Sequence, residues 1–209
     1  MENYVIAIAR EFGSGGKEIG MKLAKELGIP CYEQQILEMA SEQSGINEAL
    51  FLQTDEKLRG SHLLNLLRKK PMTYVVSPNS KDFVSDTNIF NIQAEVIKSL
   101  AQNESCIIIG KCADYVLRDY NNVFRIFIEA PFQTCAESIS KKLYVDIKEA
   151  EQLVRKTNKY RADYYKYYTN GLNWKDSLNY DMTLNSDKIG REQCVELIKE
   201  YVKIKLGNR

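Results

Sequence analysis

Short apolar segments alternate with stretches of helical periodicity along most of the chain. The short segments predict buried strands over residues 4–9, 105–109, 123–128 and 181–184. Between them, apolar residues recur every three or four positions, which predicts helices over residues 16–27, 33–44, 88–102, 113–117, 131–143, 146–168 and 190–206. Strands that alternate with helices indicate an α/β fold, in which a parallel sheet is flanked by helices on both faces.

One region departs from this alternation. Residues 45–87 contain helical fragments at 49–52 and 63–67, followed by the loop signals Pro71 and Ser-Pro-Asn-Ser. We interpret a segment of about 40–87 as an insertion with its own binding surface. The length of 209 residues suits one domain, so we predict a single domain over 1–209 that carries this insertion.

The sequence Gly13-Ser14-Gly15-Gly16 lies between the first predicted strand and the first predicted helix. Glycines let backbone amides turn toward one point, and the start of the helix adds the positive end of its dipole. A tight turn without a ligand would have the same composition. The position directly after the first strand favours a phosphate-binding loop, whose amides over 13–17 would hold an anion.

This loop differs from the usual pattern G-x-x-x-x-G-K-[ST]. Alignment on Gly-Ser-Gly puts Arg10 at the first glycine, Gly16 at the lysine and Lys17 at the Ser/Thr position. The hydroxyl that normally holds Mg²⁺ is therefore absent. Arg10 or Lys17 could restore positive charge, and Glu11 or Glu18 could position a metal ion through water.

Five stretches carry a resemblance to a known family. They read I-A-I-A-R-E-F-G-S-G-G-K-E-I-G with L-A-K-E-L-G-I-P-C-Y-E, S-C-I-I-I-G-K-C-A-D-Y-V-L-R-D, V-F-R-I-F-I-E-A-P, K-T-N-K-Y-R-A-D-Y-Y-K-Y-Y-T and N-Y-D-M-T-L-N-S-D-K-I-G. Together they resemble the cytidylate kinase-like family, a variant branch of the P-loop nucleoside monophosphate kinases. The resemblance spans nearly the whole chain and is weakest over residues 50–88.

The resemblance implies a P-loop fold with an acceptor-binding insertion and a helical lid over about 144–175. It implies ATP and Mg²⁺ as cofactors, nucleotides as substrates, and transfer of a phosphoryl group to a nucleoside monophosphate such as CMP. Three groups of residues are expected to form the site. Catalytic residues are Arg10, Lys17, Arg155 and Arg161; donor phosphates bind Gly13, Ser14, Gly15, Gly16, Lys17 and Glu18; the acceptor binds Glu33, Lys111 and Asp114.

Two of these positions, and one neighbouring position, differ from the family's pattern. Lys111 stands where the family has an arginine, and a lysine cannot make the two-pronged contact of a guanidinium. Glu33 replaces an aspartate. Asn158 replaces an aspartate three residues before Arg161, so a carboxylate able to orient that arginine is lost.

Composition and charge indicate which classes of binding partner to expect. The net charge of +1 gives no overall field that would attract nucleic acid. Residues 155–175 do interleave basic and aromatic side chains, a pattern also found in single-strand binders, but tyrosines at helical spacing indicate packing inside the protein. Nucleic acid is therefore not the expected partner, whereas a homo-oligomer remains compatible with the sequence.

Further features exclude other kinds of site. The five cysteines form no C-x-x-C pair, so neither a disulfide framework nor a zinc site is predicted. His62, the single histidine, is interpreted as a surface residue, and no metal-ligand set stands out. No apolar run is long enough to span a membrane, and the first residues do not resemble a signal peptide, so the cytoplasm is the expected location.

Two alternatives to a nucleoside monophosphate kinase stay open. One is a nucleotide- or anion-binding module with weak or no turnover, which the unusual loop, Lys111 and Asn158 favour. The other keeps the phosphoryl transfer but uses a different small acceptor.

Overall fold

A five-stranded parallel sheet forms the centre of the computed structural model, which describes residues 3–57 and 74–207. The sheet order is β2-β3-β1-β4-β5, and every neighbouring pair is parallel. The strands are β1 (Val5–Arg10), β2 (Cys31–Tyr32), β3 (Cys106–Ile109), β4 (Val123–Glu129) and β5 (Met182–Asn185). From β1 the chain first builds the β3 side of the sheet and then the β4 side. The carboxyl end of β1 therefore lies at the topological switch point, where such sheets bind ligands.

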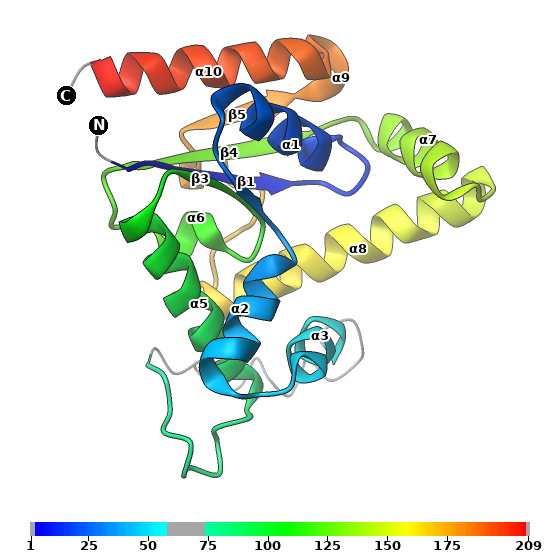
Figure 1. Cartoon of the computed structure of the whole chain (residues 1–209). Coiled ribbons are helices and arrows are strands. Elements are labelled where there is room, and N and C mark those ends of the chain that lie inside the picture. Colours follow the sequence, from blue (N-terminus) through cyan, green and yellow to red (C-terminus); the bar gives the residue numbers. More distant parts are fainter. Residues whose placement is uncertain (1–2, 58–73, 208–209) are drawn as a thin grey trace.

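Helices cover both faces of the sheet (Figure 1). The longer described helices are α1 (Gly16–Leu27), α2 (Gln35–Ser44), α3 (Glu48–Lys57), α5 (Asp86–Asn103), α7 (Phe132–Leu143), α8 (Ile147–Tyr168) and α10 (Arg191–Gly207). Short helical turns are α6 (Ala113–Val116), the 3₁₀ turn η1 (Ser177–Asn179) and α9 (Ser186–Ile189). Among the described residues, no helix is both long and apolar enough to cross a membrane.

The alternation of side chains along β1 separates two hydrophobic cores. Ile6 and Ile8 belong to the core that α1 and α10 cover, whereas Val5, Ala7 and Ala9 belong to the core on the opposite face. Successive residues of a strand point to opposite faces, so an entirely apolar strand is buried from both sides. The three-layer arrangement follows from this composition.

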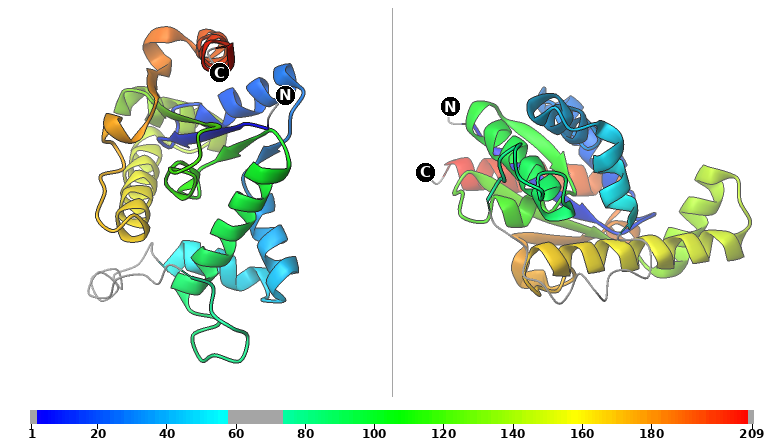
Figure 2. Two further views of the ribbon diagram at one scale, coloured as in Figure 1. Left: turned by 90° about the vertical axis from the view of Figure 1, so that its left-hand side faces the viewer. Right: turned by 90° about the horizontal axis from the view of Figure 1, so that it is seen from below.

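A helical hairpin extends from the sheet (Figure 2). Helices α7 and α8 form it, and their connection contains Tyr144 with a left-handed φ of 57°. The other end of α8 packs on α5, where the rings of Phe90 and Tyr168 stack with centroids 3.9 Å apart and planes 12° from parallel. Tyr164 and Tyr168 also contact each other, so the tyrosine spacing of this helix reflects packing inside the protein.

Most of the predicted elements are confirmed. All the predicted strands are present within a residue or two of their expected ends, and the fragment at 49–52 is part of α3. Strand β2 and helix α9 were not predicted, because segments of two and four residues are too short to show a periodic pattern. The predictions for residues 63–67, Pro71 and His62 lie outside the described part of the chain.

Candidate active site

The loop between β1 and α1 has the backbone form that its glycines predict. Gly13 and Gly15 adopt φ values of 91° and 81°, a region that side chains disfavour. A Cβ on Gly13 would lie 2.5 Å from the carbonyl oxygen of Cys135, so the loop also needs glycine for space. The amide of Ile19 donates to Gly15 O at 2.9 Å, so the amides of residues 16–18 precede the first i to i−4 hydrogen bond of the helix.

The side chain of Ser14 anchors the loop to the rest of the protein. Its side chain is buried, and its hydroxyl donates to the carbonyl oxygens of Glu11 and Ile128 at 2.9 and 3.2 Å. The Ser14 carbonyl oxygen in turn accepts a 2.6 Å hydrogen bond from the Ser186 hydroxyl. Ser14 therefore holds the loop on the ends of β4 and β5, and it is not among the residues that line the cavity described next.

A cavity of about 440 Å³ opens beside the loop at the carboxyl ends of the strands, within the size range of small-molecule sites. Its lining combines the loop with α2, α3, the turn after β3, α7 and α8. Ten of the predicted site residues contribute: Arg10, Gly13, Gly15, Gly16, Lys17, Glu18, Glu33, Lys111, Asp114 and Arg161. Ser14 and Arg155 do not.

Arg10 runs along the carboxyl edge of the sheet. A Cβ on Gly16 would lie 2.5 Å from Arg10 Cβ, and a Cβ on Gly110 would overlap the Arg10 guanidinium. The side chain thus passes from β1 over the loop to the end of β3. There its Nη2 donates to Glu33 Oε1 at 2.7 Å, and only 15% of the side chain is exposed.

Glu33 pairs with both cations of the loop. Its Oε2 accepts a 2.5 Å contact from Lys17 Nζ, while Oε1 pairs with Arg10. Burial raises the pKa of Glu33, but the hydrogen bond from Lys17 and the charge of Arg10 outweigh it, so the pKa lies below its usual value. The carboxylate is therefore ionised at neutral pH.

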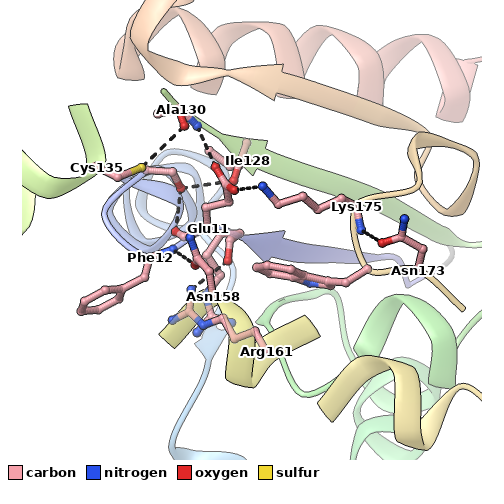
Figure 3. A network of polar contacts seen from close by, with 12 residues as sticks. Glu11, Phe12, Ile128, Ala130, Cys135, Asn158, Arg161, Asn173 and Lys175 are labelled. Atoms are coloured by element: carbon pink, nitrogen blue, oxygen red, sulfur yellow. Dashed lines mark hydrogen bonds and ion pairs between the residues drawn. The ribbon is translucent and has the colours of Figure 1, made fainter. Parts of the chain in front are cut away.

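Two further carboxylates of the loop are also paired with lysines. Glu18 accepts a 2.6 Å hydrogen bond from Lys142 of α7. The buried Glu11 accepts from Lys175, and its other oxygen lies 3.4 Å from the Ala130 amide (Figure 3). Three acidic side chains, Glu11, Glu18 and Glu33, therefore lie at or beside the loop, and each is matched by at least one cation.

The turn after β3 carries the residues expected at the acceptor. Lys111 and Cys112 both adopt left-handed φ values, 57° and 53°, which turn the chain sharply into α6. Asp114 is 4% exposed and accepts a 2.8 Å hydrogen bond from the Tyr165 hydroxyl of α8. Burial raises the pKa of Asp114 to about 6, although the hydrogen bond from Tyr165 acts in the opposite direction.

Helix α8 is attached to the glycine loop by two hydrogen bonds (Figure 3). Asn158 Oδ1 accepts from the Phe12 amide at 2.7 Å, and Arg161 Nη1 donates to Arg10 O at 2.8 Å. Asn158 thus accepts a hydrogen bond from the loop backbone. An aspartate side chain at position 158 could accept the same bond. Arg155 lies elsewhere, with its guanidinium 4.1 Å from the centre of the Phe132 ring.

The acidic residues of the cavity could hold a metal ion only if a bound phosphate supplied further ligands. The described residues contain no group of three or more His, Cys, Asp or Glu side chains that could hold an ion. Mg²⁺ in phosphate sites needs only one or two carboxylates, because phosphate oxygens and water complete its shell. Glu18 and Glu33 line the cavity beside the helix start and could supply such a carboxylate.

Sequence reasoning did not assign Lys142 or Lys175 to the site. Both lysines lie far along the chain from the loop, on α7 and after α8. Lys175 ends the basic and aromatic stretch 155–175, but nothing in the local sequence pairs either lysine with a carboxylate of the loop. The only available signal was the presence of unmatched carboxylates at Glu11 and Glu18, which a buried or half-buried loop must neutralise.

The sequence model described as the cytidylate kinase-like family matches residues 5–188. No curated protein matches the sequence. Among solved structures, an uncharacterized protein from Eubacterium ventriosum is 27% identical with a TM-score of 0.69, and the match covers 96% of this chain and 99% of that chain.

Two kinases share the fold at lower identity. The shikimate kinase from Bacteroides thetaiotaomicron is 12% identical with a TM-score of 0.52, over 96% of this chain and 98% of that chain. The shikimate kinase from Acinetobacter baumannii, solved in complex with shikimate, is 11% identical with a TM-score of 0.50, over 99% and 95%. These similarities show that the fold is that of the P-loop kinases.

Proposed function

The chain belongs to the cytidylate kinase-like family, and we propose that it transfers the γ-phosphoryl group of ATP, with Mg²⁺, to a nucleoside monophosphate such as CMP. In this reaction an acceptor phosphate oxygen forms a bond to the γ-phosphorus. The bond from that phosphorus to the β–γ bridging oxygen breaks, which gives ADP and a nucleoside diphosphate.

One observation carries the proposal. The helix start at residues 16–18 opens onto the same cavity as Lys111 and Arg161, which come from the turn after β3 and from α8. A donor phosphate on the amides and an acceptor phosphate at Lys111 would therefore meet within one enclosed space. Phosphoryl transfer depends mainly on positioning and on charge, and this arrangement supplies both.

The residues receive the following roles in the proposal. The amides of Gly15 to Glu18 hold the donor phosphates, and Arg10 and Lys17 take over the charge of the missing loop lysine. Lys111 holds the acceptor phosphate, and Asp114 shapes the acceptor side. Mg²⁺, when bound, would draw negative charge away from the transferred group.

We further propose that two segments enclose the reactants. Helix α8, with the turn before it and the residues after it, about 144–175, acts as a lid that brings Arg161 to the donor phosphates and excludes water. The segment of about 40–87 contains α3 and contacts the cavity through Leu52. It forms the acceptor side. Arg155 reaches the phosphates only if the lid moves.

The direct test is an acceptor panel. The protein is incubated with ATP, Mg²⁺ and each nucleoside monophosphate, and ADP and the diphosphate product are measured. We expect ADP to form with one acceptor and not without it. Lys111→Ala should raise the KM for the acceptor by about tenfold or more, and the KM for ATP should change little. ADP formation that does not depend on any acceptor would contradict the proposal.

A nucleotide-binding module without turnover is the second candidate. It is favoured by the pairing of Glu33 with Arg10 and Lys17, which reduces the positive charge available in the cavity. Thermal stabilisation by nucleotide, with no product from any acceptor, would support this function. Small hydroxy acids belong in the panel, including shikimate, because a kinase of another acceptor would otherwise give the same negative result.

A further inference from the structure

We propose that Glu33 is a built-in competitor for phosphate: its carboxylate occupies Arg10 and Lys17 until a polyphosphate displaces it. This inference rests on the proposed function in one respect, because it takes the cavity beside the glycine loop as a phosphate site. The inference adds that Glu33 determines which anions can bind at that site. The expected ligand is an anion with several adjacent charges.

The geometry of Glu33 is that of a bound anion. Its two oxygens pair separately with the two cations, Oε1 with Arg10 Nη2 at 2.7 Å and Oε2 with Lys17 Nζ at 2.5 Å. A phosphate group next to the helix start would use the same two donors. Guanidinium and ammonium groups bind carboxylate and phosphate oxygens alike, so the two ligands exclude each other at these atoms.

The surroundings indicate which partner moves. Arg10 is enclosed by the backbone at Gly16 and Gly110, where even a Cβ would collide with it. Glu33 lies between β2 and α2, and its amide donates only to the nearby Gln35 Oε1, at 3.1 Å. Its side chain is 21% exposed, and that of Lys17 is 49% exposed. We therefore infer that Glu33 turns away while Arg10 stays in place.

This exchange favours highly charged ligands. A monovalent anion carries the same single negative charge as the Glu33 carboxylate. To bind, it would have to break the ion pairs of Glu33 with Arg10 and with Lys17. Charge-assisted hydrogen bonds of partly buried groups are stronger than exposed ion pairs, so such an anion gains nothing. A polyphosphate brings several charges and can also use the amides of residues 16–18.

The alternative role for Glu33 is that of an anchor. In that case the carboxylate would hold Arg10 and Lys17 in the orientation that phosphate requires, and its removal would weaken phosphate binding. The two roles predict changes of opposite sign in the same measurement. Binding can therefore decide between them without any assay of turnover.

The experiment compares Glu33→Gln with the wild-type protein. Dissociation constants for inorganic tripolyphosphate are measured by calorimetry in the presence of EDTA, so that no metal contributes. We expect Glu33→Gln to bind about tenfold tighter or more, which corresponds to at least about 1.4 kcal/mol. Circular dichroism and the melting temperature of each variant show whether it is folded.

Glu26→Gln is the matched control. Glu26 lies on α1 and accepts a 2.7 Å hydrogen bond from Lys199, so this change also removes one paired carboxylate. It belongs to the last turn of α1 and does not line the cavity. We expect its affinity for tripolyphosphate to equal that of the wild-type protein. A similar gain in both variants would show a general charge effect and would overturn the proposal.

A double-mutant cycle locates the effect. In a Lys17→Ala background, Glu33→Gln should gain less affinity than in the wild-type background, because one of the released cations is absent. An equal or lower affinity of Glu33→Gln for tripolyphosphate, or no binding by either form, would overturn the proposal. If Glu33→Gln does not fold, Glu33→Asp serves instead, since its shorter arm cannot span both cations.

The binding experiment and the kinase assay test the two proposals separately. Tighter binding by Glu33→Gln in a protein that transfers no phosphoryl group would support the competitor and reject the kinase. An active kinase whose affinity for tripolyphosphate is unchanged or lower in Glu33→Gln would do the reverse.

Discussion

Arg10 stands where the usual phosphate loop has its first glycine, and its guanidinium lies over Gly110 at the end of the neighbouring strand. At the scale of single residues, this substitution explains why glycine is needed at two places far apart in the sequence. It also explains why Glu33 faces the loop, since a largely buried guanidinium requires a partner. Single side chains at this site are thus arranged in charge pairs.

Asp114 predicts a dependence of stability on pH. Burial raises its pKa to about 6 from an ordinary value of 3.8, so the folded chain holds the proton more tightly than the unfolded chain. Its favourable contribution is complete below about pH 4 and is lost as the pH rises through 6.

We therefore expect Asp114→Asn, which keeps an acceptor for Tyr165, to stabilise the protein more at pH 7 than at pH 4. The difference should be about 2 kcal/mol in urea unfolding, because the unfolded carboxyl is already partly ionised at pH 4. A gain that does not change between these pH values would mean that Asp114 is not a buried, perturbed carboxyl.

Gln93 gives a second prediction for a single side chain. In the described part of the chain, its side chain is 1% exposed, and neither its amide nitrogen nor its amide oxygen has a hydrogen-bond partner. Gln93→Met keeps the shape and removes both polar atoms, so we expect a gain of about 1–2 kcal/mol in unfolding free energy. Gln102→Met, an exposed change on the same helix, should stay within about 0.5 kcal/mol. A loss of stability at position 93 would indicate that ordered water satisfies the amide.

At the scale of elements, the glycine loop depends on its neighbours as much as on its own residues. The end of β4 accepts the Ser14 hydroxyl, α9 contributes the Ser186 hydroxyl, and α7 places the Cys135 backbone against Gly13. Helix α8 adds the Asn158 contact to Phe12. Four elements distant in sequence therefore fix one short loop.

Replacement of Gly13 tests this dependence. Gly13→Ala places a methyl group 2.5 Å from the Cys135 carbonyl oxygen, whereas Gly28→Ala meets nothing within 4 Å. Both positions have positive φ, 91° and 66°, so an alanine at either position should cost a similar backbone strain of about 1 kcal/mol. We expect Gly13→Ala to lose at least about 2 kcal/mol more than Gly28→Ala in thermal unfolding. Equal losses would show that α7 can move away from the loop.

At the scale of the whole molecule, the cavity lies where α2 and α3, the carboxyl edge of the sheet and the α7–α8 hairpin meet. Its lining comes from the loop after β1, from α2 and α3, from the turn after β3, and from α7 and α8. A ligand that contacts all these walls would connect them. Its binding should therefore stabilise the fold as a unit.

This gives a prediction for the complete protein. At a concentration of ATP about 100 times its dissociation constant, unfolding should cost about 2.7 kcal/mol more. For a chain of this length the melting temperature should rise by roughly 5–10 °C. Differential scanning calorimetry with and without ATP and Mg²⁺ measures the shift, and Lys17→Ala should reduce it at the same ATP concentration. The absence of any shift would contradict nucleotide binding in this cavity.

Much of the fold could be predicted from the sequence, because its signals are local. The alternation of apolar strands with amphipathic helices, the Gly13–Gly16 turn after the first strand and the spacing of the later motifs all act through neighbouring residues. They determined the parallel α/β arrangement and the family, and ten of the residues that line the cavity were among the predicted site residues. Strand β2 could not be predicted, because two residues are too few to show a periodic pattern. Its backbone hydrogen bonds to β3 define it as a strand.

The electrostatic state of the site was decided only by the tertiary structure. The sequence contains Glu33, Arg10 and Lys17, but it does not show that one carboxylate lies between the two cations. Nor does the sequence show that the Ser14 hydroxyl donates to the Ile128 carbonyl oxygen of β4. Periodicity and turn chemistry act over a few residues and can be read along a chain. Ion pairs depend on distances in space between residues as far apart as Glu11 and Lys175, and only the packing of the sheet, the loop and α8 sets those distances.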